Sequence, residues 1–256
     1  MSPQPIAILL CAGYGTRMGA LTASTPKPLL PVGSKPMLDY LLDLLLELEG
    51  LGAIHVVSNA RYLAAFQSWA RQRSKRHRRE IFVHNDGSTS NDDRLGAIGD
   101  LQFALRHADA GAGALVTAGD NIFRFSLQPL WQAFRDRGHS YVLGLEERDP
   151  QKLRRTGVLE LAEDQRVGRL HEKPQEPPSH WACPSLYCLQ PSALERLPSY
   201  LAASDQHDEI GRFLGYLASR EPLYAHTTTG QRLHVGSPEA LQHADRELTD
   251  PPNNDR

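Results

Sequence analysis

The stretch Ile6–Val32, IAILLCAGYGTRMGALTASTPKPLLPV, predicts the fold of this chain. It opens with an almost unbroken apolar run from Ile6 to Leu10. Such a run, ended by glycines, is typical of a strand that is buried on both faces of a parallel sheet. Gly13 and Gly15 follow, and glycine lets the backbone approach a ligand closely or adopt a positive φ. A glycine loop at the carboxyl end of a strand turns several N–H groups toward one point, which suits phosphate oxygens.

Two positive charges belong to the same stretch. Arg17 ends the glycine loop, and Lys27 stands between Pro26 and Pro28, which stiffen its segment because each proline locks φ. The spacing matches neither the GxxxxGKS/T phosphate loop nor the GxGxxG dinucleotide fingerprint. The residues themselves therefore predict a polyphosphate site, and we interpret the ligand as a nucleoside triphosphate.

Length, charge and cysteine content limit the number of domains, the kinds of partner and the compartment that we expect. At 256 residues we expect one domain over residues 1–249, followed by a polar tail at 250–256. The formal net charge of −2 predicts no nucleic-acid or anionic-membrane partner. Three cysteines without metal-like spacing indicate reduced thiols in a cytoplasmic protein, and no apolar run is long enough to span a membrane. The sequence leaves the oligomeric state open.

One charged run needs its own interpretation. Residues Arg71 to Arg79 include six basic side chains and His77. A nucleic-acid patch and the solvated end of a surface helix both fit such a run. We favour the surface helix, because no aromatic residues interleave the charges and Glu80 ends them.

Short apolar strands alternate with helical stretches through the first half of the chain. The expected strands are residues 6–10, 53–57, 81–84, 114–118 and 141–145, and the first expected helix is 36–51. Further on, residues 157–161 and 166–170 have the pattern of a hairpin. This order predicts an α/β sheet flanked by helices, with an α+β extension. We expect the α/β part to span about residues 1–145 and the α+β extension to span about residues 146–249.

The segment from Asn85 to Gly99 is a second candidate for nucleotide contact. It begins with a polar loop and continues into a helix that carries Gly96 and Gly99 in its first turns. Glycine weakens a helix by about 1 kcal/mol relative to alanine, so the pair suggests that something approaches closely there. A helix cap with small-residue packing explains the same pattern, and the two interpretations are compatible.

The string Gly13-Tyr14-Gly15-Thr16-Arg17, followed by Pro26-Lys27-Pro28, resembles the amino-terminal signature of the sugar-1-phosphate nucleotidyltransferases. The similarity is to the short, glucose-1-phosphate thymidylyltransferase-like forms, and it implies a Rossmann-like, mostly parallel sheet. It also implies that nucleotide contacts come from Leu10, Ala12, Gly13, Gly15, Thr16, Arg17, Lys27, Asn85 and Gly96.

Three later motifs follow in the order that this resemblance implies. Gly119-Asp120-Asn121 is similar to a segment whose aspartate binds a divalent metal. Thr156-Gly157-Val158 is similar to a segment whose glycine faces the sugar. His171-Glu172-Lys173-Pro174 is similar to a motif whose glutamate holds sugar hydroxyls and whose lysine holds the sugar phosphate. Each motif is weak alone, but their common order over nearly the whole chain makes a strong signal.

Two positions depart from the pattern. The family has a second metal-binding aspartate just before a VGTPE-like segment, and His234 stands there instead. This puts the metal site and the activity in question, and it makes His234 only a doubtful metal ligand beside Asp120. Pro184-Ser185 replaces a Thr-Gly pair, which bears on sugar specificity.

The implied reaction is nucleotidyl transfer to a sugar 1-phosphate, with Mg²⁺ as cofactor and Mn²⁺ as an alternative. Its partners are a nucleoside triphosphate and a sugar 1-phosphate, and Arg17, Lys27, Asp120 and Lys173 are the expected catalytic residues. Two other functions stay open: a cytidylyltransferase for a polyol or choline phosphate, and a catalytically weak nucleotide-sugar-binding protein. The sequence leaves base and sugar unnamed.

Overall fold

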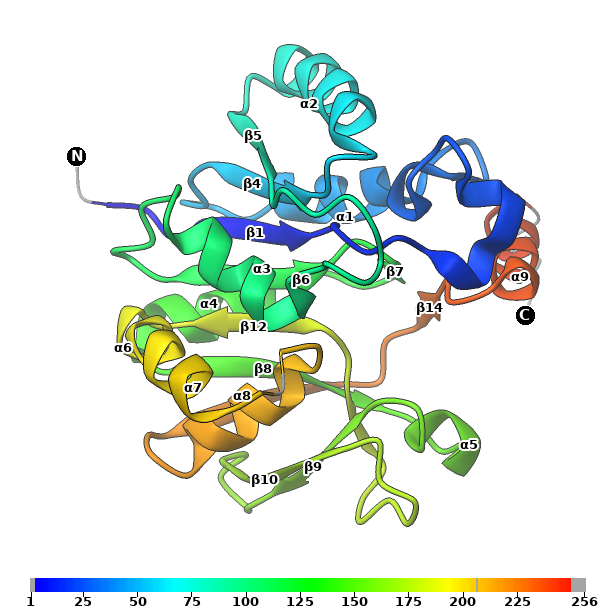
Figure 1. Ribbon diagram of the computed structural model, residues 1–256. Helices are drawn as coiled ribbons and strands as arrows, with labels where there is room; N and C mark the ends of the chain where they lie inside the picture. Colours follow the sequence, from blue (N-terminus) through cyan, green and yellow to red (C-terminus); the bar gives the residue numbers. More distant parts are fainter. Residues whose placement is uncertain (1–2, 206, 250–256) are drawn as a thin grey trace.

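The computed structural model describes residues 3–205 and 207–249. Its main element is a ten-stranded sheet (Figure 1). Nine strands follow the order β10-β9-β11-β8-β12-β6-β1-β4-β5, and the tenth, β13, pairs with β8. The proposed tail, residues 250–256, lies outside the described residues. The strands of the main sheet are β1 (Ile6–Leu10), β4 (Ile54–Ser58), β5 (Ile81–Asn85), β6 (Ala114–Ala118), β8 (Ser140–Glu146), β9 (Gly157–Leu161), β10 (Val167–Glu172), β11 (Trp181–Cys183), β12 (Leu186–Leu189) and β13 (Leu223–Thr228).

β1 lies inside the sheet and sends its side chains into two separate cores. Ile6 and Ile8 belong to one apolar cluster, and Ala7 and Leu9 belong to the other. This alternation follows from the period of two along a strand. Both faces are covered, so the run has no polar side, as the sequence predicted for a strand buried on both faces.

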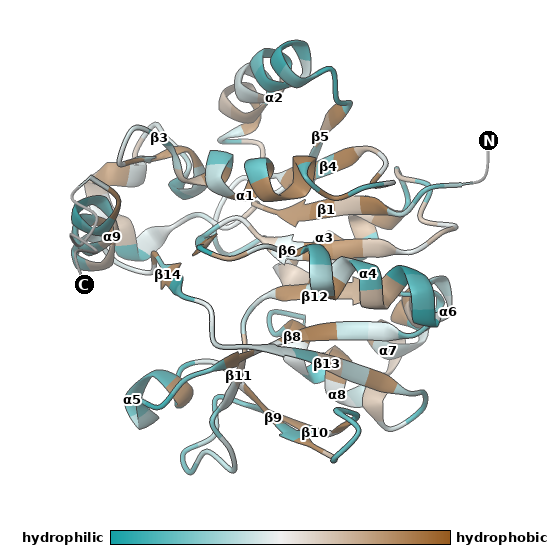
Figure 2. Ribbon diagram, turned by 180° about the vertical axis from the view of Figure 1, so that it is seen from behind, coloured by the Kyte–Doolittle hydropathy of each residue, from teal (hydrophilic) through white to brown (hydrophobic). Residues whose placement is uncertain are grey.

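Helices cover both faces of the sheet. One face carries α3 (Gly96–Leu105), α6 (Pro191–Glu195), α7 (Leu197–Ala203) and α8 (Ile210–Ala218), and the other carries α1 (Met37–Leu46), α2 (Leu63–His77) and α4 (Gln128–Arg137) (Figures 1 and 2). In Figure 2 the strands are largely hydrophobic, whereas the outer surface of α2 is hydrophilic. α2 contains most of the basic run, and Arg73 within it is held by Asp39. No described helix has the length and hydropathy to cross a membrane.

The expected mixed sheet is confirmed. β6, β1, β4 and β5 are parallel neighbours, and β12 lies between β6 and β8 in the opposite direction. The predicted hairpin is also present, because β9 and β10 pair antiparallel, and α5 (Pro150–Leu153) precedes them. α8 packs on β10. The extension therefore continues the main sheet.

The last described elements, β14 (Arg232–His234) and α9 (Pro238–Thr249), pack near elements from earlier in the chain. β14 pairs with β7 (Asn121–Phe123), directly after the end of β6. α9 then packs near η1 (Thr16–Thr22) and the small ribbon of β2 (Pro31–Val32) and β3 (Lys35–Pro36). A third apolar cluster fills this corner. Residues distant in sequence thus gather beside the glycine loop.

The first helix is shorter than the sequence predicted. α1 ends at Leu46, whereas the leucine pattern extended to Leu51. The carbonyl of Glu49 accepts hydrogen bonds from Trp131 and Arg135 of α4, so it is turned toward α4. Leu51 remains buried without being helical, because tertiary packing replaces the helical pattern.

Candidate functional site

The register of two strands creates the site. β1 and β6 are parallel neighbours with Leu10 opposite Ala118. The glycine loop after β1 and Gly119-Asp120 after β6 therefore emerge at the same edge of the sheet. Ligands of open α/β sheets bind at this carboxyl edge. Gly119 allows the close approach, since a Cβ on it would lie 2.6 Å from the Cys11 sulfur.

Buried polar side chains hold the glycine loop. Gly15 has φ +62°, a conformation that glycine adopts without strain. The Asn59 amide donates to the carbonyl of Ala12 at 2.7 Å. The Tyr62 hydroxyl contacts the carbonyls of Tyr14 and Thr22 at 3.2 Å and 2.7 Å. Asn59 and Tyr62 are not among the residues predicted from the sequence, where their only local signal is a position just past a buried strand.

Lys27 and Asp120 meet at the edge of the site. Lys27 begins η2 (Lys27–Leu29), and its Nζ lies 2.7 Å from Asp120 Oδ2. Their side chains are only 14% and 22% exposed, so the pair is poorly screened by water. Burial works to raise the pKa of Asp120, but the charge of Lys27 and the hydrogen bond that Lys27 donates outweigh it and hold that pKa below its usual value. Asp120 is therefore a carboxylate at neutral pH.

A cavity of about 250 Å³ lies between these two loops. The predicted residues that line it are Leu10, Gly13, Gly15, Thr16, Arg17, Lys27 and Asp120. Asn91 and Arg94 also line it, although the sequence analysis did not single them out. Ala12 is buried next to this wall and gives its carbonyl to Asn59. The cavity thus brings together one carboxylate and several cations, which suits a polyphosphate.

Asn85 and Gly96 lie outside that lining. Asn85 ends β5, and its side chain accepts from the N–H of Gly87 at 3.1 Å. Gly96 has φ +76°, and a Cβ on it would lie 2.6 Å from the carbonyl oxygen of His207. The group that approaches Gly96 in this structure is therefore the backbone at His207. The N–H of Ile98 also donates to the carbonyl oxygen of His207, at 2.8 Å.

The sugar-side residues lie together at the β9–β10 hairpin. Glu172 is opposite Gly157 in the register, and its Oε2 would lie 2.0 Å from a Cβ on Gly211. Burial, and next the nearby charge of Glu209, raise the pKa of Glu172. Lys173 has φ +47°, and its Nζ lies 2.5 Å from Glu209 Oε1. Lys173 is 51% exposed, so it is accessible from solvent.

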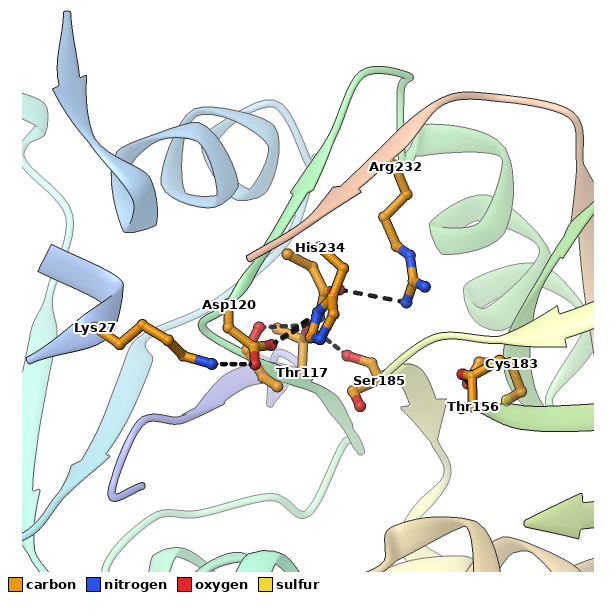
Figure 3. A network of polar contacts seen from close by, with 10 residues as sticks. Lys27, Thr117, Asp120, Thr156, Cys183, Ser185, Arg232 and His234 are labelled. Carbon is orange, nitrogen blue, oxygen red and sulfur yellow. Dashed lines mark hydrogen bonds and ion pairs between the residues drawn. The ribbon is translucent and has the colours of Figure 1, made fainter. Parts of the chain in front are cut away.

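His234 lies at Asp120, as its sequence position suggested (Figure 3). Its Nδ1 is 3.9 Å from Asp120 Oδ1. Burial lowers the pKa of His234, and the charge of Asp120 only partly offsets this. The ring is therefore neutral at pH 7. Within residues 3–205 and 207–249, no cluster of three or more His, Cys, Asp or Glu side chains is arranged to hold a metal ion.

The segment that departs from the family pattern, Pro184-Ser185, contacts the end of β6. The carbonyl of Ser185 accepts from the Thr117 hydroxyl at 2.7 Å and from the Ala118 N–H at 3.2 Å (Figure 3). It thereby ties the segment between β11 and β12 to the end of β6, the strand that precedes Asp120.

Arg232 is a further residue that sequence reasoning missed. It lies two positions before His234 on β14, and in Figure 3 it lies on the side of Cys183, with which it interacts electrostatically. Its Nη1 is 3.4 Å from Asn121 Oδ1. An arginine before a VGSPE-like segment was the only signal in the sequence.

Comparisons with known proteins identify the family. A model of the family described as Nucleotidyl transferase matches residues 6–251. Mannose-1-phosphate guanylyltransferase catalytic subunit beta of Drosophila pseudoobscura pseudoobscura is 28% identical over 91% of this chain and 59% of its own length. Glucose-1-phosphate thymidylyltransferase of Neisseria gonorrhoeae is 32% identical over 73% of this chain and 62% of its own length. The chain thus spans about three fifths of these curated relatives.

Solved structures share the fold. A crystal structure described as a glucose-1-phosphate thymidylyltransferase from Bacillus anthracis, in complex with sucrose, superposes with a TM-score of 0.83 at 22% identity and covers 96% of both chains. UDP-glucose pyrophosphorylase complexed with UDP-glucose superposes with a TM-score of 0.79 at 20% identity, over 95% of this chain and 98% of that one. At these identities the likeness establishes the architecture alone.

Proposed function

Because this chain belongs to the nucleotidyl transferase family, we propose that it joins a nucleoside triphosphate to a sugar 1-phosphate, forming a nucleoside-diphosphate sugar and pyrophosphate. The observation that carries the proposal is the Lys27–Asp120 pair in the wall of the glycine-loop cavity. The names of the relatives, a guanylyltransferase and a thymidylyltransferase for sugar 1-phosphates, support the substrate classes.

In this reaction an oxygen of the sugar phosphate attacks the α-phosphorus of the triphosphate in line. A new phosphorus–oxygen bond forms, the bond to the bridging oxygen of the β-phosphate breaks, and pyrophosphate leaves with its electron pair. Positioning and charge neutralisation dominate such a transfer. Arg17 would hold the leaving pyrophosphate through its planar fork. Lys27 would hold the α- or β-phosphate, and Lys173 the attacking phosphate.

Asp120 is the residue that fits a divalent cation. Its carboxylate is partly exposed at the cavity, and oxygen ligands suit Mg²⁺, which often uses one or two carboxylates with substrate phosphates. When bound, the ion would offset the charge that accumulates on the phosphates. The imidazole of His234 suits later transition metals better, so we assign it no Mg²⁺ contact and keep Mn²⁺ as the alternative.

The sites divide between the two halves of the chain. We assign the nucleotide to about residues 1–145, with Asn85 and Gly96 near the base. We assign the sugar phosphate to about residues 146–249, with Gly157, Glu172 and Lys173 as contacts. A cytoplasmic location agrees with Cys11, Cys183 and Cys188, which are all buried as free thiols.

The test is a matrix of UTP, dTTP, GTP, CTP and ATP against glucose, mannose and N-acetylglucosamine 1-phosphates, with Mg²⁺ and pyrophosphate release as readout. CTP with choline phosphate or ribitol 5-phosphate extends it to the cytidylyltransferase alternative. Lys27→Ala should lower the rate of the productive pair by about 10²–10³-fold. Lys35→Ala is the matched control, because Lys35 also pairs with an aspartate, Asp43, but lies outside the cavity lining.

A binding protein is the second candidate, and His234 is the observation that favours it. Besides Asp120, no carboxylate lines the described cavity. Tight binding of a triphosphate without pyrophosphate release from any pair would support this candidate and contradict the enzyme.

A further inference from the structure

Arg232 is an arginine without a carboxylate partner. Among the described residues, no carboxylate oxygen pairs with its guanidinium, and its one hydrogen bond is the long contact of 3.4 Å to Asn121 Oδ1. Arg73, by comparison, is fixed by both carboxylate oxygens of Asp39. The side chain of Arg232 is partly buried, and burial lowers its pKa despite the charges of Asp120 and Glu147.

The strand places Arg232 on the same side as His234, away from the third apolar cluster. Side chains alternate along β14, so Leu233 packs into the third apolar cluster, whereas Arg232 and His234 face the other way. Pairing with β7 sets Arg232 opposite Phe123 and His234 opposite Asn121. In Figure 3, His234 lies at Asp120 and Arg232 lies on the side of Cys183.

This position is separate from the triphosphate cavity. Arg17, Lys27 and Asp120 line that cavity, but Arg232 does not. The side chains that interact electrostatically with Arg232 include Asp120, Glu147, Cys183 and Tyr187. Arg232 therefore lies between the metal-binding candidate and the strands β11 and β12 of the sugar side.

A partly buried cation without an ion pair lowers stability, because it loses water and here gains only the long hydrogen bond to Asn121. A bound anion would restore that interaction, and the guanidinium fork matches the two oxygens of a phosphate. Lys173 and Arg212, two cations on the sugar side, are already paired with Glu209, at 2.5 Å and 2.9 Å. Arg232 is thus more available than Lys173 to donate hydrogen bonds to a phosphate.

We propose that Arg232 binds the phosphate of the acceptor, the sugar 1-phosphate, beside Asp120. The phosphate would then be held by Arg232 from β14 and by Lys173 from the β10 end. That the phosphate belongs to an acceptor rests on the proposed function, whereas the anion site itself rests on the unpaired guanidinium.

The first experiment measures binding without turnover. Inorganic phosphate and glucose 1-phosphate are titrated calorimetrically into wild type, Arg232→Met and Arg124→Met. Arg124 is the matched control, since it contacts Gln231 next to the same β7–β14 pair but points to Glu247, outside the cleft. We expect Arg232→Met to weaken phosphate binding by about 10- to 100-fold, with less than a twofold change for the control. Equal binding by wild type and Arg232→Met, including no binding by either, would overturn the proposal.

The second experiment separates a binding role from a structural one. Without ligand, Arg232→Met should melt at the same temperature as wild type or higher, because it removes an unpaired cation. A melting temperature lowered by several degrees, with phosphate binding retained, would mean that Arg232 is structural.

In the pyrophosphate assay, Arg232→Met should raise KM for the acceptor about tenfold or more and leave KM for the triphosphate within about twofold. Pyrophosphate release with an unchanged acceptor KM would refute the assignment while the proposed function stands. Phosphate binding that depends on Arg232, without pyrophosphate release from any substrate pair, would support the anion site and contradict the proposed enzymatic activity.

Discussion

Asp100 is a buried carboxyl group that makes stability depend on pH. It lies on α3 with 7% of its surface exposed, and its Oδ1 has no hydrogen-bond partner among the described residues. Burial is the main cause that raises its pKa to about 8, and the charge and hydrogen bond of Asp86 and the charge of Asp208 add to it. Asp100 is therefore largely protonated at pH 7 in the folded chain.

The sign of the effect follows from linkage. The unfolded chain releases this proton near pH 4, whereas the folded chain keeps it until about pH 8. Stability from this group is full below about pH 4 and is lost as the pH rises to 8. Each pKa unit corresponds to about 1.4 kcal/mol, so the whole interval amounts to on the order of 5 kcal/mol.

We expect Asp100→Asn to raise the free energy of unfolding. The amide keeps the shape and can donate to Asp86 without a pH-dependent cost, but its burial costs more than that of a protonated carboxyl. The net gain should be about 2–4 kcal/mol at pH 8 and should turn into a net loss of about 1–3 kcal/mol near pH 4, where only the extra cost of burying the amide remains. Urea unfolding at pH 5, 6, 7 and 8 measures it, and the m-value should stay constant. Asp92→Asn, at an exposed position, is the control. An Asp100→Asn variant that is less stable than wild type at pH 8 would refute this reasoning, since it would mean that Asp100 is ionised and paired.

Three further predictions concern the proposed reaction. Arg17→Ala should nearly abolish pyrophosphate release with an unchanged melting temperature, because Arg17 lines the cavity and forms no ion pair with any described residue; a collapsed melting temperature would make it structural. Lys173→Ala should lower the rate by about 10²–10³-fold through the sugar phosphate, with little change in stability because its bond to Glu209 is a half-exposed ion pair; equal weakening of both ligands would contradict this role. His234→Asp should keep or raise activity with Mg²⁺ across pH 6–8, and a wild type that strongly prefers Mn²⁺ or Co²⁺, with the variant reverting to Mg²⁺, would identify His234 as a metal ligand.

The sequence predicted the elements whose cause is local. The run from Ile6 to Leu10 is long enough for one strand and apolar enough for two cores, so it indicated a central position. The glycine loop and Asp120 could be assigned to one site because both follow buried strands, and parallel strands end at the same edge. The strands of the first half and the β9–β10 hairpin were predicted in the same way.

The extent of the first helix shows where local pattern stops being sufficient. Its leucines continue to Leu51, but α1 ends at Leu46 because Glu49 bonds to side chains of α4. A leucine can be buried in a turn as well as in a helix, and periodicity does not distinguish the two.

Tertiary structure alone decided the contacts between residues far apart in the chain. Lys27 meets Asp120 across 93 positions, and Arg232 reaches Asn121 across 111. The residue type gives the charge of each side chain, but the sequence does not show whether a group of opposite charge lies beside it in the fold. Whether a cation is paired, like Lys173, or left unpaired, like Arg232, depends on which strands and helices become neighbours, and long-range packing sets that arrangement.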